Sequence, residues 1–156
     1  MTRTPQPPGE GAIMIPSEIV ALAASTINQV DPPAWGPAPE DATAFVRRVH
    51  ALRTVPLGRL GVDDLRLLIS QDVARETLVP LALGMLRYRP LLEGDHYPGD
   101  LLMAVLRLPA GYWPAHPSEY GLLQEALSRL DRNDPEYPVF EDDEFEKAIA
   151  RFRAGR

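Results

Sequence analysis

Three histidines and the acids beside one of them are the residues best suited to acid–base or metal chemistry. His50, His96 and His116 stand far apart in the chain, so none has the second histidine four residues away that a helical zinc site uses. Asp95, His96 and Asp100 could form an acid–base cluster, because a neighbouring carboxylate tunes an imidazole toward neutral pH. The glycines around them favour a structural interpretation, in which both aspartates accept backbone hydrogen bonds around a tight turn and a helix start.

Other motifs that would indicate catalysis are missing from the sequence. There is no cysteine to act as nucleophile or thiolate ligand, and there is no Gly-x-Ser-x-Gly elbow. The only lysine, Lys147, lies near the end of the chain and outside any phosphate-binding loop. We therefore expect a protein that is not an enzyme and that uses no cofactor and no metal.

The charged residues are distributed unevenly. The chain has 16 basic and 22 acidic residues, a net charge of −6, which would repel the phosphates of nucleic acid. Residues 134–146, here called the acidic segment, hold seven carboxylates without a basic residue: Asp134, Glu136, Glu141, Asp142, Asp143, Glu144 and Glu146. Such a run suits the solvated start of a helix, where acids complement the helix dipole. Alternatively it steers a basic partner, and we predict these seven residues as a partner-binding site.

Helices must position these residues, because apolar side chains recur at helical spacing and no alternating strand pattern is present. The stripes cover residues 19–30, 45–52, 65–69, 78–86, 101–108, 122–130 and 145–152. Ser17, Asp63 or Asp64, Thr77 and Ser118 are the expected caps, with Pro80 in the first turn of its helix and Arg53 on a polar face. The sequence therefore predicts an all-α fold, a compact bundle of six or seven helices with Pro-rich connectors.

Two of these connectors, residues 31–39 and 109–117, combine prolines with large aromatic rings. Prolines lack the backbone donor that a helix interior needs, so residues 31–39 are predicted as a linker, and residues 109–117 as a second connector rich in prolines and aromatic rings. Trp35, Tyr112 and Trp113 would clamp the loops onto the core, and anchoring a partner at an interface is the alternative.

The length of 156 residues corresponds to one domain. We predict a flexible N-terminal lead-in over residues 1–11 and a single helical domain over residues 12–156. The longest wholly apolar runs, such as Leu101 to Leu106, are six residues long and too short to span a bilayer, and the N-terminus has no apolar core of signal-peptide length. These features predict a protein that is neither membrane-bound nor exported by a signal peptide.

Two segments of the chain resemble a known family. The first contains His50-Ala-Leu-Arg53 and Val62-Asp-Asp-Leu-Arg-Leu-Leu-Ile69, and the second contains Gly94-Asp-His-Tyr-Pro-Gly-Asp-Leu-Leu102 and closes at Trp113. Together they resemble the immunity proteins of bacterial contact-dependent growth inhibition (CDI) systems. After Gln71 the chain departs from the family pattern, which has a glycine-containing stretch where residues 72–75 read Asp-Val-Ala-Arg.

The resemblance implies a small cytoplasmic protein that binds the toxic C-terminal domain of a secreted effector, often a nuclease, and neutralises it without catalysis. The shared residues are helix-core leucines and a turn, so specificity for one toxin should lie elsewhere. A nuclease presents a basic groove, which an acidic inhibitor can occupy, and the acidic segment is the natural candidate. The alternatives are a helical adaptor or regulator without a toxin partner and, less favoured, a small hydrolase.

Overall fold

The computed structural model describes residues 16–155, so the predicted lead-in over residues 1–11 lies outside the described residues. Within that range the chain forms α-helices and two short 3₁₀ helices, and the fold class is all-α as predicted. The α-helices are α1 Pro16–Ala24, α2 Ile27–Val30, α3 Ala44–Leu52, α4 Val62–Ser70, α5 Arg75–Leu86, α6 Asp100–Leu106, α7 Pro117–Ser128 and α8 Glu144–Ala154. The 3₁₀ helices are η1 Leu57–Arg59 and η2 Ala110–Ala115.

The first helix differs from its prediction, because the stripe over residues 19–30 is divided into α1 and α2. The chain bends at Ser25, whose carbonyl accepts a hydrogen bond of 2.8 Å from the amide of Leu57. Thr26 forms an isolated bridge with Pro56, and its amide donates to the side chain of Gln29 at 2.9 Å. A contact with a segment thirty residues away therefore interrupts a locally helical pattern.

Several helix starts also differ from the predicted caps. Helix α4 starts after Gly61, whose amide donates to Asp64 at 2.8 Å, so Asp64 lies inside the first turn. Helix α5 starts at Arg75, after Ala74 in the left-handed conformation, and Thr77 is not its cap. Pro80 is therefore the sixth helical residue and not part of the first turn. Helix α7 starts at Pro117, one residue before the predicted cap Ser118, because proline is favourable at the first helical position.

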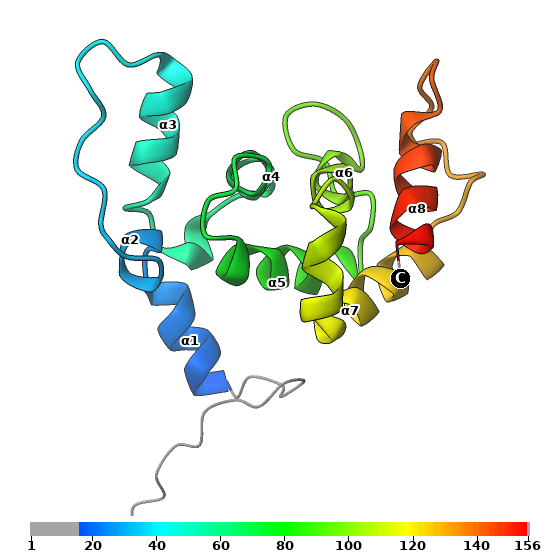
Figure 1. Cartoon of the computed structure of the whole chain (residues 1–156), viewed down its shortest axis with the longest axis horizontal. Helices are drawn as coiled ribbons and strands as arrows, with labels where there is room; N and C mark the ends of the chain where they lie inside the picture. Colours follow the sequence, from blue (N-terminus) through cyan, green and yellow to red (C-terminus); the bar gives the residue numbers. More distant parts are fainter. Residues whose placement is uncertain (1–15, 156) are drawn as a thin grey trace, which may run out of the picture.

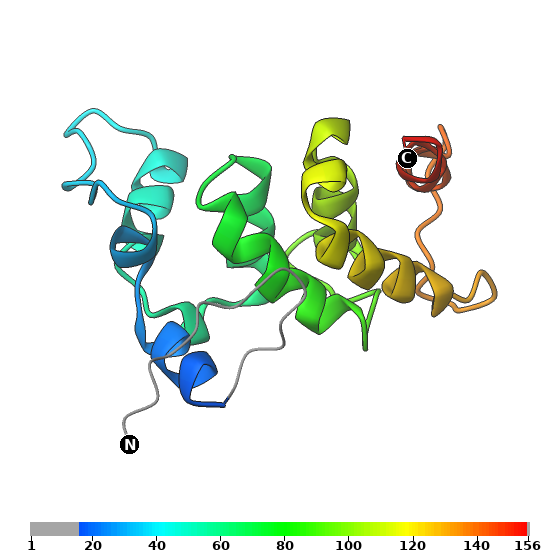
Figure 2. The same ribbon diagram turned by 60° about the horizontal axis from the view of Figure 1, so that its bottom comes forward.

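The core runs through the middle of an elongated molecule, with α3 and α8 at opposite ends (Figure 1). Helix α4 packs on α5 and α6, α5 packs on α7, and α6 packs on α8. Figure 2 shows the same succession of helices from a second direction. Leu68, Leu78, Leu102 and Leu123 are completely buried, and each such side chain stabilises the fold by about 1.5–3 kcal/mol. No helix in the described range is both long enough and apolar enough to cross a membrane.

The first Pro-rich connector is organised by Arg53, which the sequence places on a polar face but which is only 1% exposed. Its guanidinium donates to Asn28 Oδ1 at 2.9 Å and to the carbonyl of Asp31 at 2.7 Å. It also lies over the ring of Trp35, 4.3 Å from the ring centre. Trp35 remains 41% exposed, so it clamps the connector and also presents part of its ring to solvent.

The second connector is held by aromatic burial, as predicted. Tyr112 and Trp113 are each 5% exposed and meet edge to face. Trp113 packs against Phe152 of α8 and Tyr112 stacks on His116, which joins η2 to the start of α7. The two rings therefore clamp the connector, most of which forms η2, onto the core.

Candidate functional site

The turn that precedes α6 is held by two buried carboxylates. Asp100 accepts hydrogen bonds from the backbone amides of Gly94 at 2.7 Å and His96 at 3.1 Å. Asp63 of α4 accepts one from the amide of Asp95 at 3.0 Å. The prediction that Asp100 satisfies backbone donors is confirmed, whereas Asp95 participates through its backbone amide.

Arginines complete this network. Arg66 Nε lies 2.6 Å from Asp63 Oδ1 and 4.0 Å from the nearer oxygen of Asp100, and Arg48 donates to Asp63 Oδ2 at 3.0 Å. The hydrogen bond from Arg66, with those from the Asp95 amide and Arg48, outweighs burial and holds the pKa of Asp63 well below its usual range. Asp63 therefore stays ionised and ties α3, α4 and the turn together.

The two glycines of the turn have different roles. Gly99 has a φ of +91°, which favours glycine. Gly94 is needed for space instead, because a Cβ there would lie 2.7 Å from Asp63 Oδ1 and 2.9 Å from an oxygen of Asp100. The most specific part of the family resemblance is thus a backbone segment that lies directly on two carboxylates.

The structure brings together a different set of residues from the one that the acid–base hypothesis named. The side chains of Asp95 and His96 are exposed. Asp63, His96 and Asp100 are the residues whose candidate ligand atoms lie within 4.8 Å of one another. Sequence reasoning did not connect Asp63 with this turn. The carboxylate oxygens already accept hydrogen bonds from backbone amides and arginines, and Arg66 places a positive charge beside both carboxylates. We interpret the cluster as a structural network.

The acidic segment runs from the connection after α7 into the first turn of α8, where Glu144 and Glu146 lie. Five of its seven acids form no ion pair among residues 16–155, and the other two are paired. Glu136, Glu141 and Asp142 are exposed and form no ion pair among residues 16–155. Asp134 caps the local turn through the amide of Glu136, and Asp143 precedes α8 in the left-handed conformation.

The remaining two acids are paired. Glu144 lies 3.4 Å from Arg107, just after α6, and Glu146 lies 2.8 Å from Arg132. Arg132 and the hydroxyl of Tyr137 both donate to Glu146, and these bonds lower its pKa against the opposing effect of burial. The exposed acids that form no ion pair within residues 16–155 are therefore Glu136, Glu141, Asp142 and Asp143, and they carry the negative charge available to a partner.

Aromatic contacts hold the acidic segment against the turn before α6. Phe140 meets Tyr97 edge to face with ring centres 5.1 Å apart, and Tyr137 meets Phe145 in the same way at 5.4 Å. Between these anchors Val139 projects outward and is 87% exposed. An exposed apolar side chain flanked by carboxylates can add apolar contact to an electrostatic interface.

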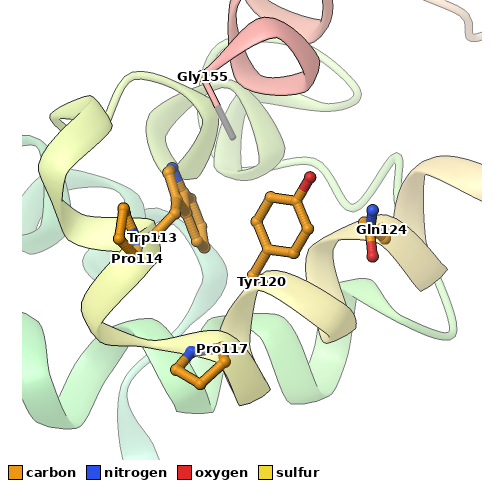
Figure 3. Close-up of a pocket in the computed structure, with 6 residues that line it drawn as sticks. All are labelled: Trp113, Pro114, Pro117, Tyr120, Gln124 and Gly155. Atoms are coloured by element: carbon orange, nitrogen blue, oxygen red, sulfur yellow. The ribbon is translucent and has the colours of Figure 1, made fainter.

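An apolar pocket of about 380 Å³ lies between η2, α7 and the end of α8 (Figure 3). Trp113, Pro114, Pro117, Tyr120, Gln124 and Gly155 line it. The hydroxyl of Tyr120 is buried without a hydrogen-bond partner among residues 16–155. The lining suits an apolar group and carries no acid or base for catalysis.

A family model described as CDI immunity proteins matches residues 29–123 of this chain. The match includes α3 to α6, the turn held by Asp63 and Asp100, and most of α7. The chain therefore belongs to the CDI immunity proteins. No curated protein sequence matches the chain. The acidic segment lies beyond the end of the matched residues.

Proposed function

We propose that this protein neutralises the toxic C-terminal domain of a CDI effector by binding it in the cytoplasm of the producing cell. Family membership supports the class of function, and the acidic segment supports the mode of binding. In this proposal the family core acts as a scaffold, and the acidic segment beside it recognises the toxin. No bond is made or broken by the immunity protein.

The observation that carries the proposal is a set of exposed carboxylates around Val139 on an anchored loop, which form no ion pair among residues 16–155. No ion pair within residues 16–155 neutralises Glu136, Glu141 or Asp142, and the contacts of Tyr137 and Phe140 hold the loop before a partner arrives. A basic toxin surface, such as the substrate groove of a nuclease, would be attracted to this charge and blocked by the loop. Because little ordering is needed on binding, more of the interaction energy remains as affinity.

Co-expression tests the function directly. The toxin domain encoded immediately upstream is expressed with or without the full immunity chain, and growth and calorimetric binding are measured. Neutralisation predicts rescued growth and a stoichiometric complex. Growth arrest in the presence of the chain, together with no heat of binding, would contradict the proposal and favour a helical adaptor without a toxin.

The role of the acidic segment needs a separate variant. Glu136→Gln, Glu141→Gln and Asp142→Asn together remove three negative charges without touching Asp143, Glu144 or Glu146. Association with the toxin should slow by about tenfold at low salt, and its salt dependence should flatten.

A matched control is the triple variant Glu40→Gln, Asp41→Asn and Glu93→Gln, which makes the same charge change at exposed positions elsewhere. If both triple variants slow association equally, only the net charge matters. If neither does, the acidic segment takes no part in recognition.

A further inference from the structure

A second surface of the molecule has the opposite electrostatic character. A cavity of about 360 Å³ opens between α4, α5 and α6, on the side of the turn before α6. Arg66, Arg75 and Arg107 line it, one from each of α4 and α5 and one just after α6, together with the exposed His96. Met103 and Leu108 contribute apolar surface. We call it the arginine cavity.

Each guanidinium keeps hydrogen-bond donors available after its ion pair. Arg66 contacts Asp63 through Nε, Arg75 contacts Asp72 through one terminal nitrogen at 2.9 Å, and Arg107 makes a long contact of 3.4 Å to Glu144. Nε of Arg75 is buried without a hydrogen-bond partner among residues 16–155. A buried donor without a partner costs free energy, so a ligand that accepts from it gains more than it would from a hydrated group.

The acids at the cavity do not fill the place of a ligand. Asp100 lines the cavity, but its two oxygens accept from the amides of Gly94 and His96. Asp72 lies at the cavity, has a side chain 67% exposed, and contacts Arg75 alone among the described basic residues. An incoming oxyanion can therefore share the guanidinium groups without displacing the buried network.

The turn that carries Arg75 is itself unusual. Asp72 and Ala74 have φ values of +58° and +48°, in the left-handed region that is costly for residues with a side chain. Backbone of this kind concentrates at binding sites, where strain is retained for placement of a side chain. Here the turn leads into Arg75, which lines the same cavity as Arg66 and Arg107.

We propose that the arginine cavity binds an oxyanion, a carboxylate or phosphate, that is carried by a group with an apolar portion. Guanidinium groups match both anions in planar geometry, and Met103 with Leu108 receives the apolar portion. The oxyanion has two possible sources, a small free molecule or an acidic side chain of the toxin, and the second rests on the proposed function. Whichever of the two supplies the oxyanion, this cavity is a binding site distinct from the acidic segment.

The first arm of the test uses inorganic phosphate and benzoate with the full chain at constant ionic strength, observed by NMR of backbone amides. We expect saturable shifts confined to the cavity, with Kd values of about 1–10 mM for these small probes. Arg75→Gln and Arg107→Gln should each weaken binding about tenfold, because each removes a charged donor. Arg59→Gln, a change of equal charge at an exposed arginine of η1, should have no effect.

The second arm measures toxin binding by the same variants. A tenfold weaker complex with the double variant Arg75→Gln/Arg107→Gln, with phosphate acting as a competitor, identifies a toxin side chain as the source. Unchanged toxin binding with loss of the phosphate or benzoate shifts identifies a free anion. Wild-type chain that binds the anions but no toxin contradicts the proposed function and leaves the cavity assigned to a small molecule.

The proposal is overturned if neither probe gives saturable shifts and the double variant binds toxin as tightly as the wild type. It is also overturned if Arg59→Gln weakens the binding of phosphate and benzoate as much as the cavity variants do. Amide spectra and urea unfolding of each variant separate loss of binding from loss of the fold. The side chains of Arg75 and Arg107 are partly exposed, so the fold should persist in these variants.

Discussion

The carboxylate of Asp63 accepts a hydrogen bond from the backbone amide of Asp95, 32 residues further along the chain, at 3.0 Å. This contact joins the first turn of α4 to the turn before α6. Because Arg66 and Arg48 neutralise the same carboxylate, the charge can be buried at the junction of three elements. The turn is therefore fixed by a partner that is remote in sequence.

Gly94→Ala tests the close approach of the turn to these carboxylates. The added Cβ would lie 2.7 Å from Asp63 Oδ1, so either the turn or the carboxylate must move. We expect the free energy of unfolding to fall by about 1–3 kcal/mol in urea denaturation. Gly84→Ala is the control, because Gly84 is exposed on α5 with no atom near its added Cβ, and that change should stabilise by up to about 1 kcal/mol. Equal effects at the two positions would contradict the steric explanation.

Asp63→Asn tests the charge of the network. The folded pKa of Asp63 is lowered, so its contribution is present above the unfolded pKa and is lost as pH falls through the folded pKa. At neutral pH the variant should lose about 3 kcal/mol, because Arg66 remains without its carboxylate. Between about pH 4 and pH 2 the stability of the wild type should fall more steeply than that of the variant. Parallel stability curves in acid would show that Asp63 carries no such charge interaction.

The sequence was sufficient for the fold class and for most helices, because leucines at helical spacing report directly on buried faces. It was insufficient where a distant contact decides local structure. The bend between α1 and α2 depends on the Ser25 contact with Leu57, and the start of α5 depends on a left-handed Ala74. Neither alters the apolar periodicity on which the prediction was based.

The same limit applies to the candidate site. The turn before α6 was predicted from its glycines and aspartates, but Asp63 was missed because nothing near it in sequence points to residues 94–96. The seven acids were predicted as one patch, whereas Arg107 and Arg132 pair with Glu144 and Glu146. The identity of the partner-binding residues stays a prediction.

Arg53→Gln tests the organisation of the first Pro-rich connector. The guanidinium is buried and donates hydrogen bonds to Asn28 and Asp31, so its removal leaves these acceptors without donors. We expect a loss of about 3 kcal/mol in the free energy of unfolding. Because the guanidinium lies over Trp35, tryptophan fluorescence of the folded variant should shift to the red as that ring becomes more hydrated. Arg59→Gln is the control, because Arg59 is exposed and has no ion pair or side-chain hydrogen bond among residues 16–155, and it should change neither property appreciably.

Pro80→Ala tests how much the missing backbone hydrogen bond at Pro80 destabilises α5. Pro80 is the sixth residue of the helix and cannot donate to the carbonyl of Glu76, one turn earlier. Alanine restores this donor, and the gain should exceed the entropy that it adds to the unfolded chain. We expect stabilisation of about 1 kcal/mol in thermal or urea unfolding. Destabilisation would show that packing of the proline ring outweighs the missing hydrogen bond.

Glu76→Gln tests a pH-dependent contact between α5 and the start of α7. His116 Nε2 lies 2.6 Å from Glu76, and Nδ1 lies 2.7 Å from the carbonyl of Tyr112. Both ring nitrogens face acceptors, and only the imidazolium donates from both. Burial opposes this charge, but the two hydrogen bonds outweigh it and raise the pKa of His116.

A raised folded pKa fixes the sign of the pH dependence. The stability that His116 contributes is fully present below the unfolded pKa, about 6.5, and is lost as pH rises through the folded pKa. The loss in the wild type should be less than about 1 kcal/mol, because Glu76 is largely exposed, and it should be smaller still in Glu76→Gln. NMR titration of the His116 ring protons measures the pKa directly. A value at or below that of an unfolded histidine would refute the pairing, whereas a raised value that falls in Glu76→Gln would assign the contact to the carboxylate.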